Sequence, residues 1–204
     1  NIIMDWNNHI YINLESRKDR NIQAINEISK LGVKPNRFNA VAAKTGIVGC
    51  VLSHMRVIKE AKDKGLPYIC VFEDDLVIKN PHVLNRKVNK LLNEEWDVLM
   101  LGGNNFKPFD QYDDYIKVNK CFTTTAYIIK EHYFDIWLNN MNEGLKILLQ
   151  TNNRDYSLDM YNHILQRRDK WFLITPIQIY QKEDYSDIEG RNVNYEKLML
   201  NYDK

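Results

Sequence analysis

The segment from Tyr68 to Ile78, YICVFEDDLVI, constrains the fold more than any other part of the sequence. Its first five residues are all apolar and lack the polar alternation of a strand that faces water on one side. Such a continuous run is typical of a strand in a parallel sheet covered on both faces. The segment therefore predicts a layered α/β fold with this strand in the middle.

Strand-like and helix-like segments alternate along the rest of the chain. We predict strands over residues 9–14, 37–41, 96–101, 124–129, 171–174 and 177–180, and helices over 16–31, 46–64, 85–92, 131–149 and 156–166. The pair Gly102 and Gly103 is expected to end the strand before it. This order indicates an open, mostly parallel sheet flanked by helices, with ligands bound beyond the carboxyl ends of the strands. Because no linker-like segment or repeat interrupts the pattern, residues 1–204 are expected to form a single domain.

The composition excludes several classes of protein. The formal net charge of +1 argues against a protein that binds nucleic acid or anionic membranes. No apolar run approaches the roughly 20 residues of a transmembrane helix. The three cysteines, Cys50, Cys70 and Cys121, match neither a disulfide framework nor a metal-ligand spacing, so we expect free thiols in the core. Free thiols favour a reducing compartment such as the cytoplasm.

Three adjacent acids, Glu73, Asp74 and Asp75, follow the apolar strand directly. Burying like charges side by side costs several kcal/mol unless a positive charge neutralises them. Carboxylate oxygens suit Mg²⁺ or Mn²⁺, and either cation could neutralise a diphosphate leaving group. An acidic turn without a ligand is the alternative, which the apolar residues on both sides of the turn disfavour.

Several motifs in a fixed order resemble one family over about residues 9–190. They are INLESRKDR (residues 12–20), RFNAV (37–41), GIVGCVLSH (46–54), YICVFEDD (68–75), DVLMLGG (97–103) and PIQIYQKEDYSDI (176–188). This set resembles glycosyltransferase family 25. The family includes lipooligosaccharide sugar transferases and the galactosyltransferases that modify hydroxylysine in collagen.

The resemblance implies a glycosyltransferase-A fold, a Rossmann-like sheet that uses a nucleotide-sugar donor and a divalent metal, Mn²⁺ or Mg²⁺. It also implies that Glu73, Asp74 and Asp75 are this chain's version of the Asp-X-Asp metal motif. Asp75 is then the first candidate for a metal ligand and Glu73 the second. Asp74 alternates to the opposite side of an extended chain and is expected to face the ribose or a neighbouring loop.

Residues around the predicted strand ends are candidates for binding the donor. The predicted substrate-binding residues are Asn13, Leu14, Arg17, Arg20, Ala40, Ser53, His54, Asp74, Gln181, Ser186 and Asp187. Arginine forks match phosphate geometry, although both arginines could instead be solvated charges on a helix. Ser53 and His54 could instead pack a helix against the sheet. Gln181, Ser186 and Asp187 could close over the phosphates, complete the metal shell or simply form a turn.

Asp155 and Asp159 lie four residues apart in a predicted helix and would share one face of it. An inverting transfer needs a base that takes the proton from the acceptor hydroxyl. Asp159 is the first candidate and Asp155 the second. The alternative is that both are exposed helical acids.

The sequence therefore predicts a metal-dependent, inverting transfer of a hexose, galactose or glucose, from a UDP-sugar to a hydroxyl acceptor. The acceptor would be a glycan or a hydroxylysine-type protein side chain. An inactive family member that binds nucleotide sugar or a partner is the alternative. A metal-dependent phosphatase or nucleotidyltransferase is less favoured, because no glycine-rich loop ending in Gly-Lys-Ser or Gly-Lys-Thr is present. The sequence leaves open the third protein ligand of the metal and the oligomeric state.

Overall fold

A mixed eight-stranded sheet forms the centre of the molecule in the computed structural model, which describes residues 2–204. The expected single domain begins at Asn1, which lies outside the described residues. The strand order is β2 (Arg37–Asn39), β1 (His9–Asn13), β3 (Tyr68–Glu73), β8 (Lys120–Lys130), β5 (Val98–Phe106), β9 (Trp171–Ile174), β7 (Tyr115–Lys117) and β6 (Asp110–Gln111). Only β8 and β7 run against the other strands of this sheet. The predicted α/β fold with a mostly parallel sheet is confirmed.

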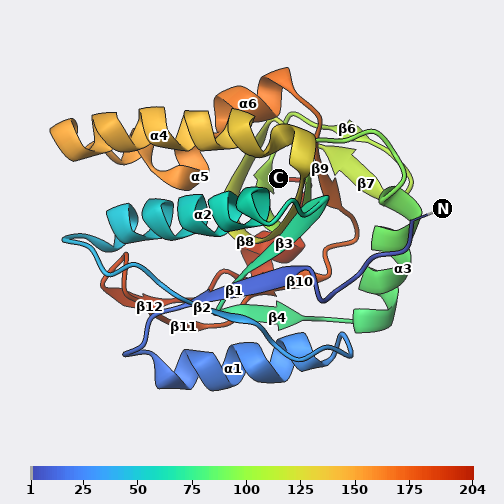
Figure 1. Ribbon diagram of the computed structural model, residues 1–204. Coiled ribbons are helices and arrows are strands. Elements are labelled where there is room, and N and C mark those ends of the chain that lie inside the picture. The colour runs from blue at the N-terminus through green and yellow to red at the C-terminus, as the bar shows by residue number, and fades with distance from the viewer. Residues whose placement is uncertain (1) are drawn as a thin grey trace.

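Helices cover both faces of the sheet (Figure 1). They are α1 (Lys18–Ser29), α2 (Gly46–Asp63), α3 (Pro81–Leu91), α4 (Phe134–Thr151), α5 (Leu158–Tyr161), α6 (His163–Arg168) and α7 (Glu196–Leu200), with short 3₁₀ turns η1 (Glu131–Tyr133) and η2 (Arg154–Tyr156). Helices α2 and α4 pack against each other on one face, and α1 lies on the other (Figure 1). Within residues 2–204, none of these helices has the length and apolar character needed to cross a bilayer.

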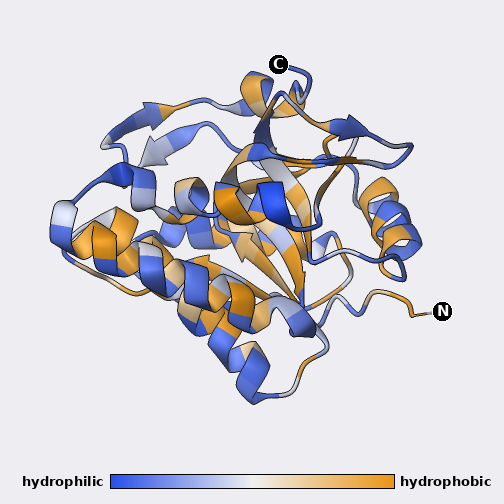
Figure 2. Cartoon of the chain, turned by 90° about the horizontal axis from the view of Figure 1, so that it is seen from above, coloured by the Kyte–Doolittle hydropathy of each residue, from blue (hydrophilic) through white to orange (hydrophobic). Residues whose placement is uncertain are grey.

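The sheet separates two hydrophobic cores, as expected for strands buried on both faces. Along β3, Ile69 and Val71 contribute to the core under α2 and α4, whereas Cys70 and Phe72 contribute to the core that includes α1 and α3. This alternation follows from the pleat, which sends successive side chains to opposite faces. Figure 2 shows the result: the central strands are mostly hydrophobic, and the helices carry hydrophobic and hydrophilic residues in alternation.

The acidic motif lies on a turn between two strands rather than at the end of one long strand. Strand β3 ends at Glu73, Asp74 and Asp75 form the turn, and β4 (Leu76–Ile78) leads away from it. Strand β4 pairs with β10 (Ile179–Gln181) in a separate antiparallel sheet. This pairing brings the C-terminal part of the chain next to the acidic turn. The hairpin of β11 (Asp184–Ser186) and β12 (Arg191–Val193) follows directly after β10.

The prediction that Gly102 and Gly103 end a strand is wrong, because β5 continues through them to Phe106. The pairing of β5 with β8 shifts register on both sides of Gly102. A Cβ atom on Gly102 would lie 2.6 Å from the carbonyl oxygen of Ile179 in β10. Glycine is therefore needed here so that β10 can approach the sheet, and not to stop the strand.

The single helix predicted over residues 156–166 is also wrong. The chain forms η2, then an extended residue at Ser157 with φ −67° and ψ 165°, and only then α5 and α6. The carbonyl of Ser157 accepts from the N–H groups of Met160 and Tyr161, so Ser157 starts a new helix. Asp155 and Asp159 consequently do not share one helix face.

Candidate active site

A pocket of about 530 Å³ opens at the edge of the sheet where β3 and β5 end and β8 begins. Its lining includes Glu73 at the end of β3, Cys50 on α2, Asp159 on α5 and Gln181 on β10. The consecutive elements α2 and β3 therefore share one site with the distant elements α5 and β10. This is the edge at which an open α/β sheet binds its ligands, as predicted.

The Glu73 carboxylate has one hydrogen-bond donor and one nearby ring nitrogen. The Thr124 hydroxyl on β8 donates to its Oε1 at 3.1 Å, and His54 Nε2 lies 3.8 Å from its Oε2. Burial acts to raise the pKa of Glu73, but nearby His54, Thr124 and Arg20 outweigh it, so this pKa lies below its ordinary value. Glu73 is therefore ionised at neutral pH and available to a cation.

Next to Glu73, the side chains of Asp75 and Gln181 contact each other. Gln181 Nε2 donates to Asp75 Oδ2 at 3.0 Å. The other two side-chain oxygens, Asp75 Oδ1 and Gln181 Oε1, take no part in this hydrogen bond. Both of these oxygens are buried and have no hydrogen-bond partner in residues 2–204. Burial first, and then the charge of Glu73, raise the pKa of Asp75 to about 7. An acid in this position is costly to ionise without a cation.

These residues fit the divalent cation that the family resemblance implies. Unpartnered buried oxygens of a carboxylate and an amide, next to an ionised carboxylate, are the oxygen donors that Mg²⁺ and Mn²⁺ prefer. Asp75 and Glu73 are the predicted ligands, and Gln181 Oε1 is a candidate for the third ligand that the sequence left open. That Gln181 adjoins the acids is a consequence of the β4–β10 pairing.

Asp74 points away from this group, as the alternation of an extended chain predicts. Its carboxylate accepts from Asn13 Nδ2 at 2.8 Å and from Arg20 at 3.2 Å. Burial raises the pKa of Asp74, and Arg20 opposes this effect. Asp74 therefore contacts the segment after β1, and a ribose contact remains a prediction.

Arg17 and Arg20 are not solvated charges, because both side chains are only 14% exposed and are held by acids. Arg17 pairs with Asp187 at 2.8 Å and Asp184 at 3.1 Å, and Arg20 pairs with Asp184 at 3.4 Å. Both also donate to the carbonyl of Tyr185. The two guanidinium groups thus tie the β11–β12 hairpin to the start of α1, beside the acidic turn.

The other predicted binding residues have mixed placements. Ser186 lines the pocket. Ser53 is buried; its hydroxyl donates to the carbonyl of Gly49 and accepts from the N–H of Val41, which favours a packing role. Leu14 and Ala40 flank the end of β1, where the N–H of Ala40 donates to the carbonyl of Asn13. Their substrate contacts stay predictions.

Asp159 lines the pocket, whereas Asp155 is exposed and is not among the lining residues that the structure describes; that either acts as the base stays a prediction. The Asp159 carboxylate accepts from the N–H of Thr123 at 3.2 Å and from the Ser157 hydroxyl at 3.3 Å. These contacts orient the side chain in a pocket that also contains Glu73. The predicted base and a predicted metal ligand therefore line one cavity.

Sequence reasoning missed the contribution of β8. Thr124 orients Glu73, and the Tyr127 hydroxyl is 2.7 Å from His54 Nδ1. Asn104 on β5 also lines the pocket with a buried Oδ1 that lacks a partner in the described part of the chain. Polar residues inside apolar strands were the available signal, because such residues need partners when buried.

Comparisons with known proteins agree with this architecture. The model of glycosyltransferase family 25 (LPS biosynthesis protein) matches residues 44–154. The crystal structure of A197 from STIV superposes with a TM-score of 0.53 at 13% identity, covering 91% of each chain. A glycosyltransferase involved in the glycosylation of the major capsid of PBCV-1 gives a TM-score of 0.53 at 9% identity, covering 81% of this chain and 79% of that one. No curated protein sequence matches the chain. At these identities the structural likeness shows a shared fold, the expected glycosyltransferase-A fold.

Proposed function

The chain belongs to glycosyltransferase family 25, and from that premise we propose the reaction that its site performs. The protein transfers a hexose, galactose or glucose, from a UDP-sugar to a hydroxyl group, with inversion at the anomeric carbon. The acceptor hydroxyl belongs to a glycan or to a hydroxylysine-type protein side chain. The reaction depends on Mn²⁺ or Mg²⁺.

The observation that carries this proposal is the pair of buried, unpartnered oxygens on Asp75 and Gln181 next to the ionised Glu73. Leaving such groups unsatisfied costs about 1–3 kcal/mol each, and more for a charged group. A cation held by Asp75, Glu73 and Gln181 removes that cost. When bound, it supplies Lewis-acid neutralisation of the diphosphate leaving group.

Arg17 and Arg20 bind the leaving diphosphate in this scheme. Their guanidinium groups pair with Asp184 and Asp187 in the ligand-free protein. The diphosphate, with more charge and more acceptor oxygens than one carboxylate, replaces these partners. Donor binding and the position of the β11–β12 hairpin are therefore linked.

Asp159 acts as the base. The acceptor oxygen forms a bond to the anomeric carbon as the bond from that carbon to the diphosphate oxygen breaks. The hydroxyl proton passes to the Asp159 carboxylate, and UDP leaves with the electron pair of the broken bond. The hydrogen bonds from Thr123 and Ser157 hold this carboxylate toward the pocket.

Calorimetry of UDP binding tests the cation site. We expect UDP to bind with Mn²⁺ and to bind at least tenfold more weakly with a chelator, and Asp75→Asn to abolish this difference. Asp113→Asn, a change in an exposed turn far along the chain, is the matched control and should behave as wild type. If Asp75→Asn had the same UDP affinity as wild type in Mn²⁺ and the same loss of affinity in the chelator, the assignment would be contradicted.

A further inference from the structure

Three side chains that include a thiol and an imidazole, and not only oxygen ligands, come together at the pocket. Cys50 and His54 lie four residues apart on α2 and so project from one face of the helix. Glu73 approaches them from the end of β3. One ligand atom from each residue, the Cys50 thiol, a ring nitrogen of His54 and a carboxylate oxygen of Glu73, lies within 4.8 Å of the other two.

His54 presents an unsatisfied ring nitrogen to this cluster. The residue is 1% exposed, and its buried Nε2 has no hydrogen-bond partner anywhere in residues 2–204. Glu73 Oε2 lies 3.8 Å away, beyond hydrogen-bond distance. A buried nitrogen without a partner costs free energy, which a ligand at this point would recover.

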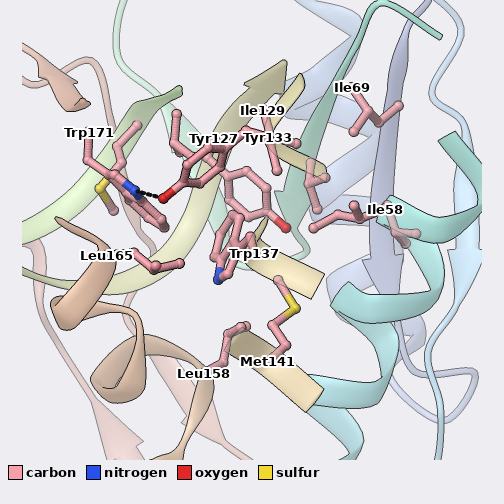
Figure 3. Close-up of a cluster of buried hydrophobic side chains, with 14 of the residues drawn as sticks. Ile58, Ile69, Tyr127, Ile129, Tyr133, Trp137, Met141, Leu158, Leu165 and Trp171 are labelled. Carbon is pink, nitrogen blue, oxygen red and sulfur yellow. Dashed lines mark hydrogen bonds between the residues drawn. The ribbon is translucent and has the colours of Figure 1, made fainter. Parts of the chain in front are cut away.

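The other side of the His54 ring has the support that metal-bound histidines have. Nδ1 lies 2.7 Å from the Tyr127 hydroxyl, so a proton on Nδ1 leaves the lone pair of Nε2 free. Tyr127 is 1% exposed, and its ring packs against that of Trp137 in the core, with the ring centroids 4.7 Å apart (Figure 3). Thr124 fixes Glu73 in the same way, by donating to Oε1.

The donor set selects the metal. A thiolate, an imidazole and a carboxylate are zinc ligands, whereas Mg²⁺ and Mn²⁺ favour oxygen. Ligand atoms around one zinc ion lie roughly 3.3–3.8 Å apart, so the three atoms must move together by about 1 Å. Because Cys50 and Glu73 both line the pocket, an ion can enter and keep a position open toward it.

We propose that Cys50, His54 and Glu73 form a Zn²⁺ site that shares Glu73 with the oxygen site of Asp75 and Gln181. Without metal the Cys50 thiol carries its proton, since burial raises its pKa well above the ordinary value, and binding releases that proton. If the proposed function holds, zinc takes Glu73 from the catalytic cation and inhibits transfer. The zinc site itself does not depend on that function.

Titration of the full chain with Co²⁺, a spectroscopic substitute for zinc, tests the site. Coordination of a thiolate to Co²⁺ produces a charge-transfer band in the near ultraviolet that oxygen ligands do not give. We expect the band to saturate at one equivalent and to disappear when Zn²⁺ is added. Cys50→Ser should lose the band, and Cys70→Ser, which removes a buried thiol on β3, should keep it.

Two further variants separate this site from the proposed catalytic one. Asp75→Asn should keep the Co²⁺ band although it loses Mn²⁺-dependent UDP binding. Tyr127→Phe leaves all three ligands in place and should lower Co²⁺ affinity by about 10–100-fold through loss of the hydrogen bond to His54. Absence of the band in folded wild-type protein, or an equal band in Cys50→Ser, would overturn the proposal. An unchanged affinity in Tyr127→Phe would overturn the supporting role of Tyr127.

Discussion

Replacing Asp75 with asparagine should stabilise the ligand-free protein while abolishing the proposed metal site. The pKa of Asp75 is raised to about 7, because burial and the charge of Glu73 oppose its ionisation. Asparagine keeps the shape and an oxygen that can accept from Gln181. It removes only the charge, which a bound cation would otherwise neutralise.

The magnitude follows from the pKa, which is raised from 3.8 to about 7 by folding. The native state then holds more protons than the unfolded state between these values, so stability falls as the pH rises through that window. Each pKa unit corresponds to about 1.4 kcal/mol, so ionised Asp75 lowers the free energy of unfolding by at most about 4 kcal/mol above pH 7. About 2–3 kcal/mol of this decrease in the free energy of unfolding occurs between pH 5 and pH 8.

Urea unfolding in the presence of a chelator measures the effect. At pH 8 we expect Asp75→Asn to exceed wild type by about 2–4 kcal/mol, and we expect this advantage to shrink by about 2–3 kcal/mol at pH 5. Asp113→Asn, in an exposed turn, should match wild type at both pH values. If Asp75→Asn were no more stable than wild type at pH 8, the idea that Asp75 is held at a cost for a cation would be refuted.

Two further predictions concern the base and the packing of β10. Asp159→Asn should keep its UDP and Mn²⁺ affinity but lose about 10²–10⁴-fold in turnover, whereas the exposed Asp155→Asn should stay near wild type; steady-state kinetics with equal turnover in both variants would remove Asp159 from the mechanism. Gly102→Ala should lower the free energy of unfolding in urea by about 1–3 kcal/mol, because its Cβ would lie 2.6 Å from the Ile179 carbonyl oxygen. It should also weaken Mn²⁺-dependent UDP binding by displacing Gln181. A variant as stable as wild type would show that β10 can move away from the sheet without loss of stability.

The fold was largely readable because its central strands carry local signals. Continuous apolar runs identify β3 and β9, and helical stripes identify α2 and α4, since burial on a sheet imposes a period on the sequence. Short strands such as β4 and β12 have no such signal. Strand β4 forms because the distant strand β10 supplies its hydrogen bonds, and β12 forms by pairing with β11 just before it. A strand of three residues carries no pattern that predicts either partner.

The site was readable only in part, for a related reason. Three acids against an apolar strand predict an ion-binding turn. The structure has Glu73 at the end of β3 and Asp75 in the turn that follows, and their binding of a cation stays a prediction. The contact of Asp75 with Gln181 spans 106 residues, and that of His54 with Tyr127 spans 73. Such contacts depend on sheet order, which local patterns do not encode.

The most direct test of the account is the release of nucleotide from a panel of sugar donors, with an added glycan acceptor. We predict that wild-type protein with Mn²⁺ releases UDP from UDP-galactose or UDP-glucose, and that a chelator or Asp75→Asn removes this activity. GDP- and CMP-sugars should not react. Turnover that survives the chelator, or equal release from a GDP-sugar, would contradict the metal or the donor. Tight UDP binding without release from any donor would instead identify an inactive member of the family.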